Sequence, residues 1–485
     1  MQQDSLKNKT IKGVGWSAAD AFLGHGITFL VGLVLARLLS PEEYGLIGIC
    51  LIFTTILNGM VDSGFSNALI RKENVFNEDY NTMFITNLAI SIVLYVVLFF
   101  SSPYIAQVFN REELVPLIQV VGSILIINAL SITQNTILTK KIDFKTKTKA
   151  SLISALLSGV IGIMMAYVGF GVWALVIQII SKQVLYTVCL WVFNRWWPNL
   201  RFSVNSFRYM WGFGSKLMIS GLLDNIWKQL YQVVVGIFYS PASLGQYSRS
   251  KEYANIFSAN ITSIVQRVSY PALAEIQDDR KRLLSAYRKI IKVTMFITCL
   301  CMISLGAVAE PLIYCLIGSK WHEAATYLPL ICISMSLYPL HAINLNMLQI
   351  QGRSDIFLYL EIIKKLIGLI PLALGIFLNI YWMLIGSIIT GLINFFLNSY
   401  YTGKKLGYTS LMQLKDVSNS YGIAFIVAIG VYFLKYLPIS YWLILPIQIL
   451  LGCGLFILIC EITGLNEYKE TKSIIINILL KKNTK

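Results

Sequence analysis

GFGSKLMISGLLDNIWKQLYQVVVGIFYSPASLG, residues 212–245, is an apolar stretch of helix length that nevertheless contains Lys216, Asp224 and Lys228. It echoes residues 13–45, GVGWSAADAFLGHGITFLVGLVLARLLSPEEYG, about 200 positions earlier, because each copy begins Gly-apolar-Gly and ends Ser-Pro-x-x-apolar-Gly. A repeated hydrophobic unit with an interface between its copies is typical of many membrane transporters. The alternative is a chance likeness between two glycine-rich membrane segments. The repeat predicts two related halves, with the second beginning near residue 210.

The composition indicates a polytopic membrane protein. Of 485 residues, 56% are hydrophobic and only 13% are charged, and the mean hydropathy is +0.66. A soluble protein carries roughly twice that charged fraction. The polar, basic start is followed by the apolar run 16–38, which is longer than a signal-peptide core and lacks a small-x-small cleavage site. We therefore expect an uncleaved first membrane span.

Disulfide and metal chemistry are not indicated by the sequence. The eight cysteines lie in or beside apolar runs and form no C-x-x-C pair, and the three histidines do not cluster. A phosphate-cradling G-x-x-x-x-G-K-[ST] motif is also missing from the sequence, so direct use of ATP is not expected. We predict no metal site, no cofactor and no catalytic residues.

Apolar runs of roughly 20 residues, enough to cross the hydrocarbon core of a bilayer, recur throughout the chain. They predict an all-α polytopic membrane protein of about fourteen transmembrane helices, placed near 16–38, 44–66, 82–101, 114–138, 150–168, 171–193, 214–238, 245–268, 289–309, 324–348, 356–377, 380–401, 420–437 and 441–462.

The repeat groups these helices into two pseudo-symmetric lobes of six, residues 1–205 and 206–405, followed by a C-terminal helix pair and tail over 406–485. Residues 194–213 are predicted to be an interfacial joint between the lobes. The charged link 269–288 is predicted to lie along the cytoplasmic surface.

The distribution of positive charge predicts the orientation. With both termini in the cytoplasm, cytoplasmic segments hold 29 lysines and arginines, and the opposite loops hold only four. The positive-inside rule selects this arrangement. Most of the net charge of +16 is therefore topological, and it is not read as a nucleic-acid footprint. The external loops are predicted to be too short for a folded domain.

A polar stripe runs along the predicted span 245–268. Five of its residues lie within about 40° of the direction of Arg249 at 100° per residue. They are Arg249, Tyr253, Asn260, Ser263 and Arg267. Glu252 lies beside the stripe, one turn from Arg249. Ionisable groups in a span are costly and mark a transport pathway by default; the alternative is a surface helix with one solvated face.

Other polar groups fall inside the spans. Asp224 and Lys228 are spaced to pair at i, i+4. His25 occupies the repeat position equivalent to Asp224 or Asn225, and Asp20 precedes it by more than one turn. A polar face of the fourth span is either functional or engaged in helix–helix hydrogen bonds. That face consists of Asn128, Ser131, Asn135 and Thr139.

The first two spans of the second half hold more cations than anions. The cations are Lys216, Lys228, Arg249, Lys251 and Arg267, and the anions are Asp224 and Glu252. A wet, cation-rich cavity with low-dielectric walls attracts an anion. Arginine in particular suits phosphate oxygens, since its guanidinium can donate two parallel hydrogen bonds. A small cationic substrate would instead favour an acidic cavity.

The sequence resembles the polysaccharide transport family of bacterial flippases. The likeness is carried by GVGWSAADAFLGHGITFLVGLVLARLLSPEEYGLIGI, DSGFSNALIRKE, LGQYSRSKEYANIFSANITSIVQRVSYPALAEIQDDRKRL and QGRSDIF, and it covers nearly the whole chain. It is closest to the colanic-acid and teichuronic-acid exporter branch. The family belongs to a superfamily that includes the lipid II flippase and the multidrug-and-toxin extruders.

The resemblance implies alternating access in the bacterial cytoplasmic membrane. The substrate would be an undecaprenyl-pyrophosphate-linked oligosaccharide for O-antigen, capsule or exopolysaccharide, with its tail in the membrane lipid, along a groove at the last helix pair. Basic residues of the cavity would bind the pyrophosphate. The substrate-binding candidates are Arg249, Arg267, Lys228, Lys216, Tyr253, Asn260 and His25. The candidates for ion coupling are Asp20, Asp224 and Glu252. A polymerase and other polysaccharide-assembly proteins are candidate partners.

Two other functions stay open from the sequence. A small-molecule antiporter of the same fold is one, although a cation-rich cavity and fourteen helices disfavour it. A membrane-embedded glycan polymerase or ligase is the other, but it would need a sizeable external catalytic loop.

Overall fold

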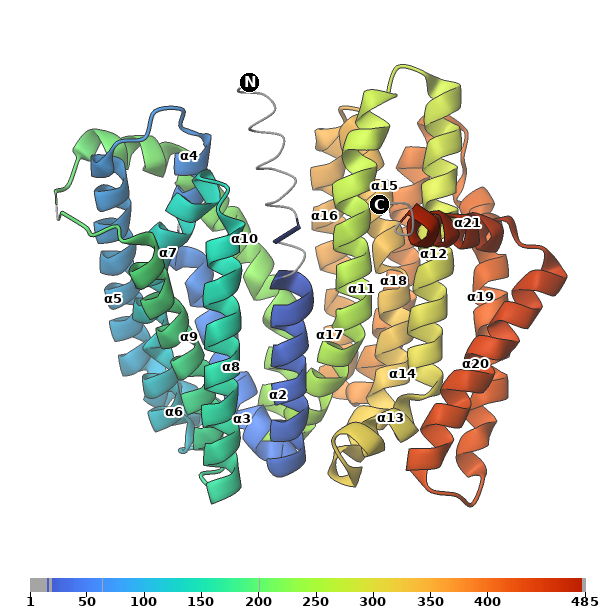
Figure 1. Ribbon diagram of the computed structural model, residues 1–485, viewed down its shortest axis with the longest axis horizontal. Helices are drawn as coiled ribbons and strands as arrows, with labels where there is room; N and C mark the ends of the chain where they lie inside the picture. The colour runs from blue at the N-terminus through green and yellow to red at the C-terminus, as the bar shows by residue number, and fades with distance from the viewer. Residues whose placement is uncertain (1–14, 17–19, 63, 200, 482–485) are drawn as a thin grey trace. The chain divides into compact units, whose positions relative to one another are not determined.

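In a computed structural model, the protein is described over residues 15–16, 20–62, 64–199 and 201–481, and every regular element in these ranges is helical (Figure 1). The first half contains η1 (Asp20–Gly24), α2 (His25–Leu38), α3 (Pro41–Val61), α4 (Phe65–Arg71), α5 (Asn77–Val108), α6 (Leu114–Gly122), α7 (Ile124–Lys140), α8 (Phe144–Val168), α9 (Val172–Asn194) and α10 (Val204–Phe238).

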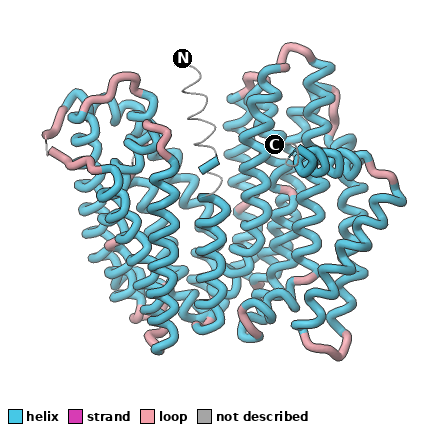
Figure 2. The backbone as a smooth tube through the Cα atoms, in the orientation of Figure 1, coloured by secondary structure: helices cyan, strands magenta, loops and turns pink. Residues whose placement is uncertain are grey.

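The second half contains α11 (Pro241–Glu275), α12 (Arg280–Ala307), α13 (Ala309–Leu316), η2 (Ser319–Trp321), α14 (His322–Ser336), α15 (Tyr338–Ile350), α16 (Ser354–Ile367), α17 (Leu369–Phe377), α18 (Ile380–Leu406), α19 (Ser410–Tyr432), η3 (Phe433–Tyr436), α20 (Tyr441–Thr463) and α21 (Asn466–Lys481). Short loops join most of these helices (Figure 2).

Ten helices in the described ranges are long and apolar enough to cross a membrane, and Gly26–Leu38 forms a shorter apolar helix. This confirms the predicted all-α polytopic fold class. The count of fourteen spans stays a prediction. The chain folds into two compact units, Met1–Gly245 and Gln246–Lys485. The predicted lobe boundaries follow the sequence repeat and also stay a prediction.

The repeated Ser-Pro motif begins a helix in both places. Ser40 caps α3 with a reciprocal pair of bonds: its backbone N–H donates to Glu43 Oε2 at 2.6 Å, and Glu43 N–H donates to Ser40 Oγ at 3.3 Å. At α11, Ser243 N–H donates to Ser240 Oγ at 3.1 Å. Proline at the first helical position adds to each start, because its ring fixes φ and it has no N–H to leave unsatisfied.

In the first unit, polar side chains in the membrane-spanning helices bond to one another. Asn128 Nδ2 donates to Asn58 Oδ1 at 3.0 Å, and Tyr186 Oη donates to Asn135 Oδ1 at 2.7 Å. Gln183 Nε2 donates to Asn128 Oδ1 at 3.3 Å. These bonds join α3, α7 and α9. Asn128 and Asn135 are therefore engaged in hydrogen bonds between helices, which is one of the two interpretations of this polar face.

The second unit is organised around a buried amide on α15. Asn344 Oδ1 accepts from three side chains, which are Tyr287 Oη at 2.7 Å, Thr402 Oγ1 at 2.9 Å and Gln413 Nε2 at 3.2 Å. Its Nδ2 donates to Leu340 O and to Gln413 Oε1. A buried amide with both ends satisfied joins α12, α15, α18 and α19 without the penalty of an unmade hydrogen bond.

The pair α19–α20 is fixed to α12 and α13 at two points. Near the start of α19, Asp416 forms ion pairs with Arg288 and Lys292, and Tyr408 Oη donates to it at 2.8 Å. Beyond the other end, Glu310 on α13 accepts from Lys435 Nζ at 2.9 Å and from Tyr441 Oη at 3.0 Å.

An apolar cluster lies between these two points. It is formed by Phe296, Ile423, Val427, Val431, Phe456 and Cys460. Helix α21 crosses the bundle near α12 (Figure 1), where Lys289 and Lys292 pair with Glu470 and Glu467.

Three predicted links are shorter than expected. The bounds predicted for the link 269–288 are wrong, because α11 continues to Glu275 and α12 begins at Arg280, where Asp279 accepts from Arg282 N–H at 3.0 Å. Its position at the cytoplasmic surface stays a prediction. Residues 204–213 are helical, and α18 and α19 are separated only by residues 407–409. In each case the helix extends beyond the run from which the span was predicted, because a helix can continue through a segment of mixed polar and apolar residues that does not stand out as a membrane span.

Candidate functional site

Helix α11 is held on one face by hydrogen bonds to the turn before α14 and to α14. Gln246 Nε2 donates to Lys320 O at 2.8 Å, and Gln246 Oε1 accepts from Ala324 N–H at 3.0 Å. Further along, Ser250 Oγ donates to Ala324 O and Ser258 Oγ donates to Met335 O, both at 2.8 Å. Ser250 and Ser258 lie roughly 100° and 180° around the helix from Arg249. Gln246 lies roughly 60° from Arg249, so the docked face begins beside the polar stripe and extends to the opposite side of the helix at Ser258.

The stripe has a buried part and an exposed part. Arg249 and Tyr253 are only 8% and 4% exposed, whereas Asn260 and Arg267 are exposed. Asn260 Nδ2 donates to Ile256 O at 2.6 Å. Arg267 forms no hydrogen bond or ion pair within the part of the chain that the structure describes. An arginine without a protein partner on a membrane protein requires water or an anion.

Arg249 is charge-compensated within its own helix. Its Nη1 lies 2.7 Å from Glu252 Oε2, one turn along α11. The arginine side chain is 9% exposed and the glutamate side chain 51% exposed. The pair therefore places a buried cation beside a half-exposed anion, which water can reach. Arg249 is thus buried and forms an ion pair, whereas the side chain of Arg267 is exposed.

The α10 candidates belong to the first unit. Lys216, Asp224 and Lys228 are all exposed. The helix that carries them packs on α3, α4 and α5. Helix α10 approaches α3 closely at Gly59, where a Cβ atom would lie 2.4 Å from Asn225 Nδ2.

Asp20 lies in a π-helical turn, η1, directly before α2. Its Oδ1 is buried and has no hydrogen-bond partner among the described residues. The charge of Asp20 acts on two lysines, Lys147 of α8 and Lys182 of α9. Their ammonium groups donate to Thr139 Oγ1 at 3.1 Å and Thr28 Oγ1 at 3.2 Å. His25 begins α2, and its side chain lies outside the described residues.

Lys182 was not among the site residues predicted from the sequence. The signal that marks it is simple, since it is a lysine inside α9, a helix long and apolar enough to span the membrane. Within the described part of the first unit, the carboxylate of Asp20 thus acts electrostatically on the ammonium groups of Lys147 and Lys182. No group of three or more His, Cys, Asp or Glu side chains in the described ranges could hold a metal ion.

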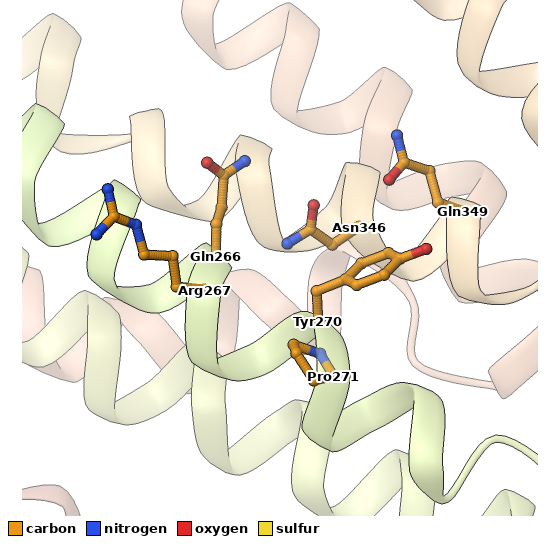
Figure 3. A pocket seen from close by; sticks show the side chains of 6 residues that line it. All are labelled: Gln266, Arg267, Tyr270, Pro271, Asn346 and Gln349. Atoms are coloured by element: carbon orange, nitrogen blue, oxygen red, sulfur yellow. The ribbon is translucent and has the colours of Figure 1, made fainter. Parts of the chain in front are cut away.

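An open hollow of about 360 Å³ lies between the C-terminal parts of α11 and α15. Its lining is Gln266, Arg267, Tyr270, Pro271, Asn346 and Gln349 (Figure 3). Pro271 lies inside α11 and has no N–H, so the carbonyl of Arg267 lacks its usual i+4 donor. The hollow therefore combines a cation, three amides and a phenol ring, and of its lining residues only Arg267 was predicted from the sequence.

The fold is similar to that of known membrane transporters. The lipid II flippase MurJ in an inward closed conformation superposes with a TM-score of 0.71 at 16% identity, over 93% of this chain and 98% of MurJ. An inward-facing multidrug resistance transporter of the MATE family superposes with a TM-score of 0.59 at 16% identity, over 80% of this chain and 99% of the transporter. The chain therefore shares the fold of MurJ and of the MATE transporter.

Sequence comparisons identify the protein family to which the chain belongs. Residues 34–326 match the family described as "Polysaccharide biosynthesis protein", and the chain belongs to that family. It is 27% identical to the succinoglycan biosynthesis transport protein ExoT of Rhizobium meliloti, over 69% of this chain and 68% of ExoT. It is 24% identical to the teichuronic acid biosynthesis protein TuaB of Bacillus subtilis, over 97% of this chain and 98% of TuaB. The resemblance seen in the sequence is confirmed.

Proposed function

We propose that this protein moves undecaprenyl-pyrophosphate-linked oligosaccharide repeat units across the bacterial cytoplasmic membrane by alternating access, for synthesis of a surface polysaccharide. Family membership and the names of the relatives support a transporter in polysaccharide synthesis. The observation that carries the substrate chemistry is the exposed guanidinium of Arg267, which has no partner among the described residues, on a helix that is hydrogen-bonded to α14 through Ser250 and Ser258. A pyrophosphate supplies the anion that such a group requires.

The two arginines have separate roles in this proposal. Arg267, nearer the cytoplasmic end by the predicted topology, meets the pyrophosphate first. Arg249 binds it deeper, where the phosphate would compete with Glu252 for the guanidinium. Lys216 and Lys228 of α10 contribute positive charge, and Tyr253 and Asn260 contribute hydrogen-bonding groups along the stripe. No covalent step is needed, because the glycan and pyrophosphate cross in water while the polyprenyl tail stays in lipid.

The orientation and the coupling are part of the same proposal. Both termini lie in the cytoplasm, as the distribution of basic residues favours. Asp20, Asp224 and Glu252 are the candidates for ion coupling, and His25 is a candidate for substrate binding. Lys147 and Lys182 would then neutralise Asp20 electrostatically in its charged form. A polymerase and other assembly proteins are the expected partners.

A small-molecule antiporter is the second candidate, favoured by the similarity in fold to the MATE transporter. The test is reconstitution of the purified protein into liposomes that carry a fluorescent polyprenyl-pyrophosphate-linked oligosaccharide. A membrane-impermeant glycosidase then reports the fraction of glycan that reaches the outer face. We expect protein-dependent exposure of nearly all the glycan, against about half in protein-free liposomes. Equal exposure in both would contradict the flippase function, and uptake of a small cation by the same liposomes would favour the antiporter.

A further inference from the structure

Two asparagines of α15 have opposite hydrogen-bonding states. Asn344 makes every hydrogen bond that its amide can be expected to make, to α12, α18 and α19. Asn346 lies two residues further on, so its side chain points about 160° away around the helix. It is 8% exposed, and its Nδ2 has no hydrogen-bond partner among the described residues.

A buried amide donor without a partner destabilises the protein that carries it. Asn346 lines the hollow between α11 and α15, where it lies between Gln266 and Tyr270 in the close view (Figure 3). Gln349, one turn further along α15, lies at one end of the hollow and Arg267 at the other (Figure 3). The side chains that line this hollow thus run from a cation, through amides and an aromatic ring, to another amide.

This order matches the chemistry of a glycosyl phosphate. A guanidinium binds phosphate oxygens through charge-assisted hydrogen bonds. Side-chain amides can donate to and accept from sugar hydroxyls, because each carries both a donor and an acceptor. The phenol ring of Tyr270, 41% exposed, offers an apolar face and a polar tip. A volume of about 360 Å³ is within the range of small-molecule sites.

We propose that the hollow is the site that recognises the first sugar of the repeat unit, with Asn346, Gln349 and Tyr270 reading the sugar and Arg267 holding the adjoining phosphate. This inference rests on the proposed flippase function and extends it, because it assigns sugar selectivity to residues outside the polar stripe. Asn346 is the positioning donor at the centre of the site, and the hydrogen bond missing in the free protein is made to the sugar.

Binding by the purified full-length protein in detergent tests the assignment. The ligands are a short-chain polyprenyl pyrophosphate, bare or carrying one glucose, one galactose or one N-acetylglucosamine. We expect at least one sugar-bearing ligand to bind wild type more tightly than the bare ligand. A variant with Asn346→Leu and Gln349→Ala should lose that gain, roughly 5- to 30-fold, and bind the bare ligand normally. Arg267→Ala should weaken both kinds of ligand by roughly tenfold or more.

Matched controls separate recognition from folding. Gln277→Ala removes an exposed amide after α11, and Arg280→Ala an exposed arginine outside the hollow; neither should alter binding. Asn346→Leu should keep or raise the Tm, because it removes an unsatisfied donor, whereas Asn344→Leu should lower it. Equal binding of bare and sugar-bearing ligands by wild type, or an equal loss of both in the Asn346/Gln349 variant, would overturn the sugar site. Failure of wild type to bind any of the ligands would instead contradict the proposed function.

Discussion

A Cβ atom on Gly45 would lie 1.7 Å from the carbonyl oxygen of Pro241, and a Cβ atom on Gly245 would lie 2.0 Å from the carbonyl oxygen of Pro41. The contact is reciprocal: the glycine of each Ser-Pro-x-x-apolar-Gly motif receives the proline carbonyl of the other. Such an arrangement is that of a two-fold interface, here formed within one chain. The repeated motif therefore has a second role beside starting a helix, since each copy packs against the other.

Substitution of either glycine should prevent this packing. We expect Gly45→Ala and Gly245→Ala each to destabilise the protein by about 3 kcal/mol, because the atoms that must yield are backbone and cannot rotate away. Thermal unfolding of the purified protein, followed by its intrinsic tryptophan fluorescence, measures the effect. Gly221→Ala is the control, because a Cβ there meets nothing within 4 Å. Equal unfolding temperatures for Gly45→Ala and Gly221→Ala would contradict the prediction.

The polar stripe of α11 should be required for export. We expect Arg249→Ala and Arg267→Ala to stay in the membrane while surface glycan falls about tenfold or more and lipid-linked units accumulate inside. Lysine at either position should rescue export in part, because the charge is kept and the planar fork is lost. Glycan on intact cells and lipid-linked intermediates in extracts are the two measurements. Normal export by the double alanine variant at normal expression would show that the stripe is structural.

The ion pair of Arg249 should contribute more to stability than an exposed pair does. Glu252→Gln removes the carboxylate charge that lies 2.7 Å from the buried guanidinium, and because Glu252 is itself half-exposed we expect a cost of only about 1 kcal/mol. Asp355→Asn breaks the exposed pair with Arg353, whose atoms are 2.8 Å apart, and should have almost no effect. Denaturant unfolding of wild type and both variants measures the loss in free energy of unfolding that each substitution causes. A larger loss in Asp355→Asn would show that burial of Arg249 is unimportant.

The predicted topology is open to a direct measurement. Reporter fusions at Lys485 and in the loop near Lys320 should report opposite sides of the membrane, with Lys485 in the cytoplasm. The reason is the excess of lysine and arginine in the segments placed there. A reporter active only in the cytoplasm and one active only outside it, each fused at both positions, provide mutual controls. The same compartment for both positions would refute the fourteen-helix arrangement.

The sequence predicts the parts of this protein that depend on local pattern. Apolar runs locate the spans, and the Ser-Pro motif marks the starts of α3 and α11. The helix ends are predicted less accurately, since α11 continues through Pro271 to Glu275, where a proline and mixed polar and apolar residues give no sign that the helix goes on. Lys182 was overlooked although it carries a clear signal, a lysine within an apolar run.

The hollow could not be predicted from the sequence. Gln266 and Tyr270 are separated from Asn346 and Gln349 by about 80 positions, and only the packing of α15 beside α11 brings them together. Asn344 and Asn346 are also indistinguishable as sequence: one is the centre of a hydrogen-bond network and the other is unsatisfied. Which face of α15 is turned inward is decided by tertiary contacts with α12, α18 and α19.

The double attachment of α19–α20 has a mechanical consequence. Asp416 holds the pair to α12 at one level and Glu310 holds it to α13 at another, with Phe296 against Phe456 between them at a centroid distance of 5.4 Å. Two attachments at different levels oppose both sliding and pivoting, so we expect the pair and α12 to behave as one rigid body. A lipid chain lying against α19 or α20 would accordingly be carried with the second unit as passive cargo, without any separate gate for the tail.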